Sequence, residues 1–379
     1  MDARPVRLDI YRTAIPARRF EHAAASRDVA EAVVVRLELA DRTVGWGETL
    51  PRDYVTGETL ETVPRDIESL LWPAAAGGDS AGKDLPVSDA EGRPITAARC
   101  AVEVALYHAW HRRKYPTLDG VAAYMRPFPA VRVSGVLGSA DPKRTARRLR
   151  LMRCCGLRDF KLKLGLGDDA DAENLRLVCR RIGKALARGT CTLRVDVNGA
   201  WTADETPGRV ADLAARGVCA VEQPVFGPPE ALAELAPRCR LPLIADESCV
   251  TGADARALLA APKIWLNLRL SKNGGIWPCW HLARLAAEAG TPFVVGCMVG
   301  ESAILSAAQR HLLWLAPQPR FVEGNYGRFL LRDDLTRRSV RFGYGGRLRP
   351  LTDAGAYWRL DVDPKRLHRY GELLKTLQA

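Results

Sequence analysis

The stretch Asp159-Phe160-Lys161-Leu162-Lys163-Leu164-Gly165 places two lysines two residues apart within an otherwise apolar run. Residues i and i+2 of a β-strand point to the same face, so a strand here sets Lys161 and Lys163 side by side. Two neighbouring ammonium groups repel each other and resist burial, and both effects favour the neutral amine. The pair is therefore a candidate general base, although an isolated Lys-x-Lys is more often a solvated strand edge.

The composition of the chain restricts the class of protein around this stretch. With 379 residues, 47 % of them hydrophobic, the chain is long enough for a large α/β barrel or for two domains. No apolar run reaches the roughly 18 residues of a membrane span, and the start of the chain lacks the layout of a secretory signal. We therefore expect a cytoplasmic protein without membrane contact.

The net charge of +12 comes mostly from arginines spread over predicted helix faces. No zinc-finger spacing and no basic, aromatic-rich sheet accompanies them, so we do not expect nucleic-acid binding. Excess positive charge favours an anionic small molecule as the partner.

The first 127 residues predict an α+β capping domain. Residues 6–15 and 29–40 read as strands, with a polar loop at 18–22 between them, and residues 95–115 carry apolar positions at helical spacing. His108 and His111 lie on that helix without a further ligand at metal spacing, so we expect them at the surface or at the edge of the core.

From residue 128 onward the pattern alternates between strand and helix. The expected strands are residues 131–137, 160–164, 192–197, 219–224, 243–247, 264–270, 292–298 and 320–323. The helical patterns between them are residues 142–154, 172–186, 204–216, 229–238, 254–261, 276–289 and 302–316. This order predicts an α/β fold, a modified (β/α) TIM-type barrel of about (β/α)7β at 128–330. Residues 331–379 are expected to return to the capping domain.

The carboxyl ends of the predicted strands carry most of the charged side chains, and the active site of such a barrel lies at that end. Asp196, Glu222 and Asp246 follow one another on three successive strands. Three carboxylates are hard oxygen ligands that suit Mg²⁺, with Mn²⁺ as a substitute. Zinc is disfavoured because no His or Cys joins them.

Lys163 and Lys272 flank these carboxylates from strands about half a barrel apart. A carboxylate substrate would present its α-carbon between the two amines, so that one lysine takes the α-proton and the other returns it to the opposite face. Lys161 is expected to lower the pKa of Lys163 and to help hold the anion. Glu247 is expected to point to the opposite face from Asp246.

These motifs resemble the enolase superfamily and, within it, the muconate-lactonizing subgroup that includes dipeptide epimerases. The segments that carry the resemblance are Lys161-Leu162-Lys163, Val195-Asp196-Val197-Asn198, Val221-Glu222-Gln223-Pro224, Ala245-Asp246-Glu247-Ser248 and Leu270-Ser271-Lys272-Asn273-Gly274-Gly275. The resemblance implies Mg²⁺-dependent proton abstraction by a lysine and a homo-oligomer. The lysine on the sixth predicted strand, Lys272, indicates this subgroup, because other subgroups place histidine or different groups there.

The resemblance also implies that capping loops and the last two barrel strands contact the substrate. The candidate contacts are Arg19, Tyr54, Asn198, Glu301, Glu323 and Asn325. The Asp-x-Asp with which dipeptide epimerases hold a substrate ammonium is replaced by Glu323-Gly324-Asn325. Glu323 still supplies one acceptor for an ammonium, whereas Asn325 supplies no second charge.

Three classes of function follow. The first is a racemase or epimerase of an amino-acid derivative, such as a dipeptide or an N-acyl amino acid, acting through an enediolate. The alternative is a lyase of the same subgroup: a dehydratase, an o-succinylbenzoate synthase or a muconate-type cycloisomerase. A non-enzymatic binding protein is disfavoured because every expected ligand and lysine is present.

Overall fold

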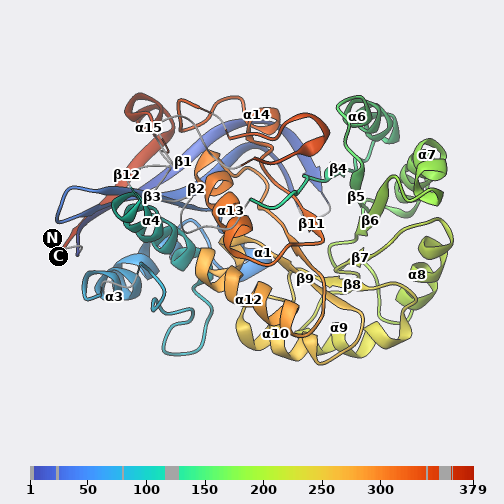
Figure 1. The fold of residues 1–379 in the computed structure, drawn as a ribbon, viewed down its shortest axis with the longest axis horizontal. Helices are drawn as coiled ribbons and strands as arrows, with labels where there is room; N and C mark the ends of the chain where they lie inside the picture. Colours follow the sequence, from blue (N-terminus) through green and yellow to red (C-terminus); the bar gives the residue numbers. More distant parts are fainter. Residues whose placement is uncertain are drawn as a thin grey trace.

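The computed structural model describes residues 4–22, 25–78, 81–115, 128–338, 340–349, 360 and 362–379. The expected domain boundary at residue 127 lies outside these residues. The two chain ends lie close together at one side of the molecule, and the barrel occupies the other side (Figure 1).

Four antiparallel strands form the sheet that caps the barrel: β1 (Pro5–His22), β2 (Ala25–Leu39), β3 (Val44–Thr49) and β12 (Gly371–Gln378), in the order β12-β1-β2-β3. The strand nearest the carboxyl end of the chain therefore pairs with the first one. The expected polar loop at 18–22 is wrong, because β1 continues through His22 and pairs there with β2. Backbone hydrogen bonds hold this end of the hairpin together, so it needs no alternating apolar pattern.

Helices of the cap follow the first three strands. They are α1 (Asp53–Thr56), α2 (Thr62–Asp66), the π-helical turn η1 (Ile67–Leu71), α3 (Trp72–Ala76) and α4 (Thr96–Lys114). Of these, α3 and α4 pack against the sheet, and α2 and η1 pack against α4. Gly45 and Gly47 let β3 lie against α4, since a Cβ at either position would collide with the α4 backbone. His108 and His111 of α4 are buried, with Nδ1 of His108 accepting from Trp46 N at 3.0 Å. Their expected place at the surface or core edge is wrong, because α4 packs against both the sheet and the barrel.

The structure confirms the predicted eight-stranded parallel sheet. Its strands are β4 (Gly135–Leu137), β5 (Asp159–Lys163), β6 (Thr192–Asp196), β7 (Val221–Glu222), β8 (Leu243–Ala245), β9 (Ile264–Leu268), β10 (Phe293–Val295) and β11 (Phe321–Val322), paired in chain order. A parallel bridge joins Val133 to Val322, and Ser134 N donates to Val322 O at 2.8 Å. The sheet thus curls until its first strand meets its last.

Helices cover the outside of the curled sheet (Figure 1). They are α6 (Pro142–Cys154), α7 (Asp168–Ala187), α8 (Thr206–Ala215), α9 (Pro229–Leu235) with the 3-10 turn η2 (Ala236–Arg238), α10 (Gly252–Leu259), α11 (Leu270–Asn273), α12 (Ile276–Glu288) and α13 (Ala303–Leu315). After β11 the described residues contain only the short α14 (Gly327–Leu330), the 3-10 turn η3 (Tyr344–Gly346) and α15 (Pro364–Tyr370) before β12. The full-length helix of an eighth repeat is missing from this described part, as the pattern of about (β/α)7β predicts.

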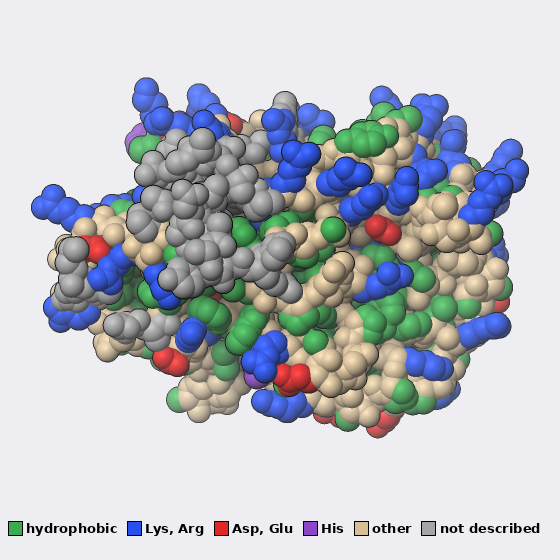
Figure 2. All heavy atoms as spheres, in the orientation of Figure 1, with side chains coloured by type: hydrophobic (Ala, Val, Ile, Leu, Met, Phe, Trp, Pro, Cys, Tyr) green, Lys and Arg blue, Asp and Glu red, His purple; other side chains and the backbone are tan. Residues whose placement is uncertain are grey.

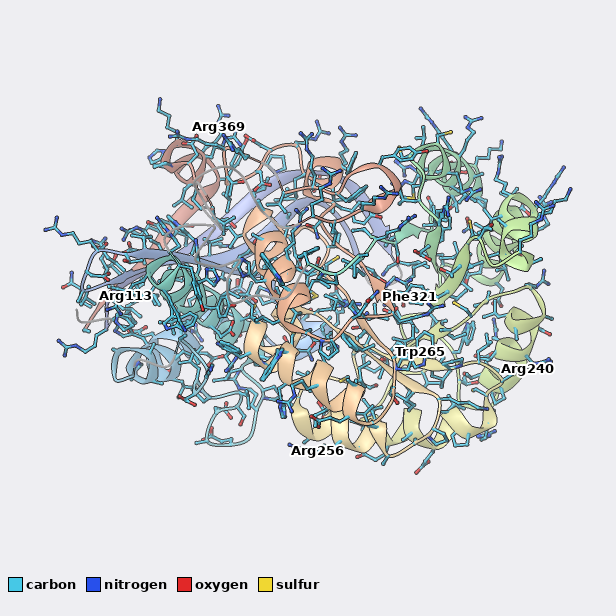
Figure 3. All side chains as sticks on the ribbon, in the orientation of Figure 1. Arg113, Arg240, Arg256, Trp265, Phe321 and Arg369 are labelled. Carbon is cyan, nitrogen blue, oxygen red and sulfur yellow. The ribbon has the colours of Figure 1, made fainter. Side chains whose placement is uncertain are left out.

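Apolar side chains close one end of the barrel interior. Ala220, Ile244, Val294 and Phe321 form a buried cluster with Trp265, and the rings of Trp265 and Phe321 lie 6.3 Å apart (Figure 3). Two residues further along, four of these five strands carry a polar side chain (Glu222, Asp246, Asn267 and Glu323), and β10 is followed by Gly296. The period of two therefore places a charged layer directly above an apolar plug.

Lysine and arginine side chains are scattered over the visible outer surface, as the positive net charge requires (Figure 2). In the described part of the chain, no helix combines the length and the apolar character needed to cross a bilayer.

Buried carboxylates join the cap to the barrel. Glu48 of β3 accepts hydrogen bonds from Ser302 N (3.0 Å), Ser302 Oγ (2.6 Å) and Leu305 N (3.1 Å) at the start of α13. Glu103 of α4 accepts from the backbone N–H groups of Ile276 and Trp277 at the start of α12. Helix amino termini carry partial positive charge, so both carboxylates stabilise this junction, which fixes the cap over the barrel.

We predict that Glu48→Ala lowers the free energy of unfolding by roughly 2–4 kcal/mol, because three buried donors lose their acceptor. Glu61→Ala, which removes an exposed glutamate of the same cap, is the matched control and should change stability by less than about 0.5 kcal/mol. Urea unfolding of both variants measures the difference. Equal losses in the two variants would show that the junction does not depend on Glu48.

Candidate active site

Three carboxylates lie next to one another at the carboxyl ends of β6, β7 and β8. Asp196, Glu222 and Asp246 are all fully buried. One oxygen of each, Oδ2 of Asp196, Oε2 of Glu222 and Oδ1 of Asp246, has no hydrogen-bond partner. Shared cations link the three side chains, since Lys161 contacts Asp196 and Glu222 while Arg269 contacts Glu222 and Asp246.

Lys161 lies inside the barrel, with 2 % of its side chain exposed. Its Nζ is 2.8 Å from Glu323 Oε2, 3.1 Å from Glu222 Oε1 and 3.3 Å from Asp196 Oδ2. Burial alone would lower the pKa of Lys161, but these carboxylates together raise it above its ordinary value. Lys161 is therefore a protonated internal counter-ion, not the neutral amine that repulsion between the two lysines would favour.

Lys163 stands at the mouth of the barrel, with 11 % of its side chain exposed. Its Nζ donates to Asn198 Oδ1 at 3.1 Å and lies 3.5 Å from Asp196 Oδ2. Gly138, beside it, leaves room for its stem, because a Cβ on Gly138 would lie 2.9 Å from the Cβ of Lys163. Of the two lysines in the opening stretch, this one reaches the pocket.

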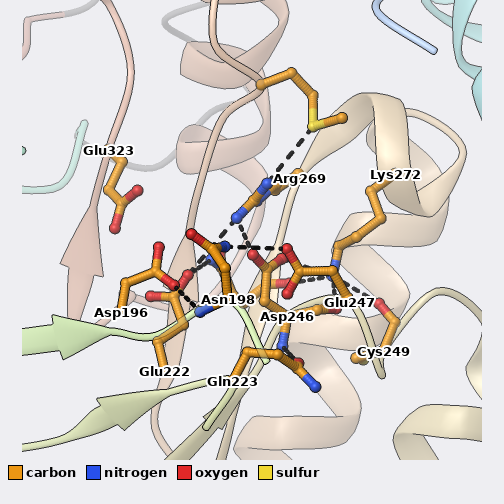
Figure 4. A network of polar contacts seen from close by, with 12 residues as sticks. Asp196, Asn198, Glu222, Gln223, Asp246, Glu247, Cys249, Arg269, Lys272 and Glu323 are labelled. Atoms are coloured by element: carbon orange, nitrogen blue, oxygen red, sulfur yellow. Dashed lines mark hydrogen bonds and ion pairs between the residues drawn. The ribbon is translucent and has the colours of Figure 1, made fainter. Parts of the chain in front are cut away.

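Lys272 lies on the one-turn helix α11, beneath the pocket, and is fully buried. Its Nζ donates to the backbone oxygens of Asp246 (2.5 Å), Cys249 (2.7 Å) and Asn267 (2.8 Å). Figure 4 shows Lys272 beside Asp246 and Cys249. Burial lowers the pKa of Lys272 to about 8. These three bonds use every N–H of an ammonium group, and the structure does not bring Lys272 to the pocket opposite Lys163.

Arg269 points toward the carboxylates from the end of β9 (Figure 4). Its Nη2 contacts Asp246 Oδ2 and lies 3.6 Å from Glu222 Oε1, and Nη1 lies 3.7 Å from Met298 Sδ. The sequence interpretation assigned it no role. The signal that could have found it is the alternation of the strand, which points Trp265, Asn267 and Arg269 to the same face. Asn267 indeed points to the carboxylates, since its Nδ2 donates to Glu222 Oε1 at 2.8 Å.

A pocket opens between the barrel mouth and the cap. Its polar lining is Arg52, Tyr54, Lys163, Asn198, Glu247 and Arg269, and its apolar lining includes Ala30, Met298 and Val299. Tyr54 and Asn198 are thus the predicted substrate contacts that reach it. The expectation for Glu247 is wrong: it lies two residues beyond the end of β8, where alternation has ended, and it accepts from Asn198 Nδ2 at 3.4 Å.

Two predicted substrate contacts after the last strand, Glu323 and Asn325, bind other side chains of the protein. Glu323 is paired with Lys161 and Arg194, and these two cations outweigh its burial and lower its pKa to about 2. Asn325 accepts from Arg310 Nε at 3.0 Å. Both are buried, and neither lines the pocket among the described residues. The expected acceptance of a substrate ammonium by Glu323 therefore conflicts with the structure.

Glu301 and Arg19 complete the predicted set. Glu301 accepts from Met298 N at 2.6 Å, and burial raises its pKa to about 8. It supports the loop that carries Met298 and is absent from the described lining of the pocket. The side chain of Arg19 lies outside the described part of β1.

Gln223 belongs to one of the motif segments, but the sequence interpretation gave it no role. Its Oε1 accepts from Asp246 N at 2.9 Å and from Ser248 N at 3.3 Å, and its backbone has a φ of 38°. A positive φ is unfavourable for a residue with a side chain. The strain is offset here by bonds that fix Asp246 against the end of β7.

The donor chemistry of the site fits a hard divalent cation. Asp196, Glu222 and Asp246 each present one buried oxygen without a hydrogen bond, which suits an oxygen-ligated ion. Two of these oxygens lie at ion-pair distance from ammonium groups: Asp196 Oδ2 is 3.3 Å from Lys161 Nζ, and Asp246 Oδ1 is 3.3 Å from Lys272 Nζ. Among the described residues, no three His, Cys, Asp or Glu side chains are already arranged around one ion position. Arg269 lies between Glu222 and Asp246, so an ion could use both only if the guanidinium turns away.

Comparison with known proteins gives a consistent family. Residues 143–356 match the family described as "Enolase C-terminal domain-like". The chain is 30 % identical over 291 residues to the N-succinyl-L-Arg/Lys racemase of Bacillus cereus, covering 74 % of this chain and 75 % of the racemase. It is 29 % identical to the L-Ala-D/L-Glu epimerase of Bacillus subtilis, covering 80 % of this chain and 83 % of the epimerase.

A cycloisomerase and a solved structure complete the comparison. Muconate cycloisomerase 1-2 of Acinetobacter lwoffii is 29 % identical, covering 82 % of this chain and 81 % of that enzyme. The crystal structure of the N-succinyl Arg/Lys racemase from Bacillus cereus has the same fold, with a TM-score of 0.83 over 99 % of this chain and 100 % of the racemase, at 23 % identity.

The two lysines of β5 should differ sharply in their effect on stability. We predict that Lys161→Met lowers the free energy of unfolding by roughly 3–5 kcal/mol, because it leaves buried carboxylates without their shared cation. Lys163→Met, at the pocket mouth, should cost about 1 kcal/mol or less. Denaturant unfolding with a chelator present measures both values, and similar losses would contradict the different surroundings of the two amines.

Proposed function

Because the chain belongs to the enolase superfamily, we propose that it removes the α-proton of a small carboxylate substrate and stabilises the resulting enediolate. The observation that best supports this proposal is the position of Lys163. Its amine lies at the pocket, within reach of Asn198 and Asp196, whereas the carboxylates behind it are buried. Proton abstraction needs a base that reaches the substrate and, beside it, charged groups that are held in place by the fold. Lys163 and the buried charged side chains behind it meet both requirements.

We propose that Asp196, Glu222 and Asp246 hold a Mg²⁺ ion, with Mn²⁺ as a substitute. When bound, the ion supplies positive charge that stabilises negative oxygens on the substrate. Lys161 keeps the carboxylate layer in place by neutralising part of its charge from below.

Lys163 Nζ accepts the α-proton in this proposal, and Asn198 Oδ1 orients the amine. Tyr54 contributes to the wall formed by the cap and reduces access of water to the reacting carbon. Glu247, whose pKa burial raises to about 6, adds a polar wall beside Asn198.

The first candidate outcome is racemisation or epimerisation of an amino-acid derivative. The printed names of the racemase and epimerase relatives support it. Because Glu323 is already paired with Lys161 and Arg194, an N-acyl amino acid fits the site better than a dipeptide with a free ammonium.

The second candidate is a lyase reaction, such as elimination or cycloisomerisation. The position of Lys272 favours it, since its ammonium is fully hydrogen-bonded to backbone oxygens and does not line the pocket. A muconate cycloisomerase is among the relatives. For either outcome we propose a homo-oligomer that acts on a small molecule, without nucleic acid or membrane as a partner.

Lys163→Ala should abolish exchange of the substrate α-proton, because no other amine lines the described pocket. The assay incubates the protein with Mg²⁺ and N-succinyl-lysine in D₂O and follows the α-proton signal by NMR. Lys184→Ala, at an exposed site on α7, is the matched control and should keep the parent rate. Undiminished exchange by Lys163→Ala would remove Lys163 as the base.

Asp246→Asn should weaken Mg²⁺ binding at least about tenfold, or ~1.4 kcal/mol, because an amide oxygen carries no net charge. Isothermal calorimetry on the substrate-free protein measures the Kd directly. The control is Asp169→Asn, which changes an exposed carboxylate of α7 and should leave the Kd unchanged. An unaltered Kd in Asp246→Asn would exclude Asp246 as a ligand.

A further inference from the structure

We propose that Arg269, rather than Lys272, is the side chain that faces Lys163 across the pocket, so that proton transfer runs on one face of the substrate. This inference rests on the proposed function, because it concerns which side chains meet the carbon that loses its proton. It narrows the reaction to one in which a single amine both removes and delivers the proton.

Exposure separates four cations on β5 and at the end of β9 into two pairs. Lys163 and Arg269 line the pocket, and each has 11 % of its side chain exposed. Lys161 and Lys272 are buried and are absent from the described lining. One cation of each pair comes from the β5 side and the other from the end of β9. Arg52 of the cap also lines the pocket, so Lys163 and Arg269 are the two barrel cations that a ligand in the pocket can reach.

Hydrogen bonding holds Lys272 in its buried place. All three N–H groups of its ammonium have backbone partners, on Asp246, Cys249 and Asn267. Reaching the pocket would break these bonds and leave three buried carbonyl oxygens without this donor, which is unfavourable. Lys272 is therefore a positioning residue that ties the segment after β8 to the end of β9.

The neighbouring strand leaves room for Arg269. Gly296, just after β10, lies beside it, and a Cβ at that position would sit 3.1 Å from Arg269 Cγ and would collide with the Asn267 side chain. The Nε of Arg269 is buried and has no hydrogen-bond partner. The guanidinium thus retains donor capacity beyond its contacts with Asp246 and Met298, and it can bind an anionic group of the substrate.

The chemistry of a guanidinium excludes Arg269 as the second base. It stays protonated in proteins, has no acceptor, and cannot take a proton from carbon. The α C–H bond therefore breaks toward Lys163: its electron pair stays on the substrate as the enediolate, and the proton moves to Lys163 Nζ. Return of that proton to the same face restores the original configuration.

If the substrate carries a leaving group on its β-carbon, the same residues can carry out an elimination. The electron pair of the enediolate forms the carbon–carbon double bond, and the leaving group departs with its own pair and takes the proton from Lys163. Atoms and charge balance without a second base. The substrate class that fits is a carboxylate with a further anionic group for Arg269 and a leaving group on the face of Lys163.

The stereochemical test uses N-succinyl-L-lysine and N-succinyl-D-lysine as probes, each in D₂O with Mg²⁺. We expect the wild-type protein to exchange the α-proton of one enantiomer at least about 100-fold faster than that of the other, without inversion. Arg269→Lys places an amine on the second face and should gain exchange of the slower enantiomer. Comparable exchange of both enantiomers by the wild type would overturn the inference and leave the proposed function standing.

A second measurement needs no substrate and no variant. Reductive methylation of the native protein, followed by peptide mass spectrometry, should modify Lys163 and leave Lys272 unmodified. Methylation of Lys272 as fast as Lys163 would overturn the inference. Absence of exchange with both probes, in the wild type and in Arg269→Lys, would instead count against the proposed function for N-acyl amino acids, while the methylation pattern still decides the inference.

Discussion

The contact between Lys161 and three carboxylates is the constraint on which the site depends. A charge inside a barrel has lost its hydration, and only an opposite charge at close range offsets that loss. Glu222, Glu323 and Asp196 all contact one ammonium from β5, and Arg269, Arg194 and Lys163 each pair with one of them as well. The apolar cluster on one side of these carboxylates and the cap on the other keep bulk water away from them. Water therefore cannot replace the cations as their partners.

Charge compensation also decides which groups remain for a substrate. The cations at the site are Lys161, Lys163, Arg194, Arg269 and Lys272, and the anions are Asp196, Glu222, Asp246, Glu247 and Glu323. The charged side chains in the barrel interior are paired with each other or with backbone oxygens. Lys163 and Arg269, at the barrel mouth, are partly exposed to solvent. The exposure of each barrel cation therefore predicts its role better than its residue type does.

The barrel could be predicted from sequence because its signals are local. Alternation of short apolar strands with helical patterns gave eight strands and seven helices, and the strand ends marked Asp196, Glu222 and Asp246 in advance. The position of Lys272 was different. Its burial follows from three carbonyl groups that approach α11 only in the folded chain, and no spacing in the sequence reports them. The β1–β2 hairpin beyond residue 17 likewise has no apolar period, because it is held by backbone pairing.

The central claim is that Lys163 and Arg269 face each other across the reacting carbon while Lys272 stays on the backbone. A crystal structure with Mg²⁺ and an N-succinyl amino acid tests it most directly. We predict that Lys163 Nζ and the Arg269 guanidinium lie on opposite sides of the ligand, with Lys272 Nζ still bonded to Asp246, Cys249 and Asn267. An electron-density map with Lys272 Nζ turned toward the α-carbon and Arg269 turned away from the ligand would contradict it.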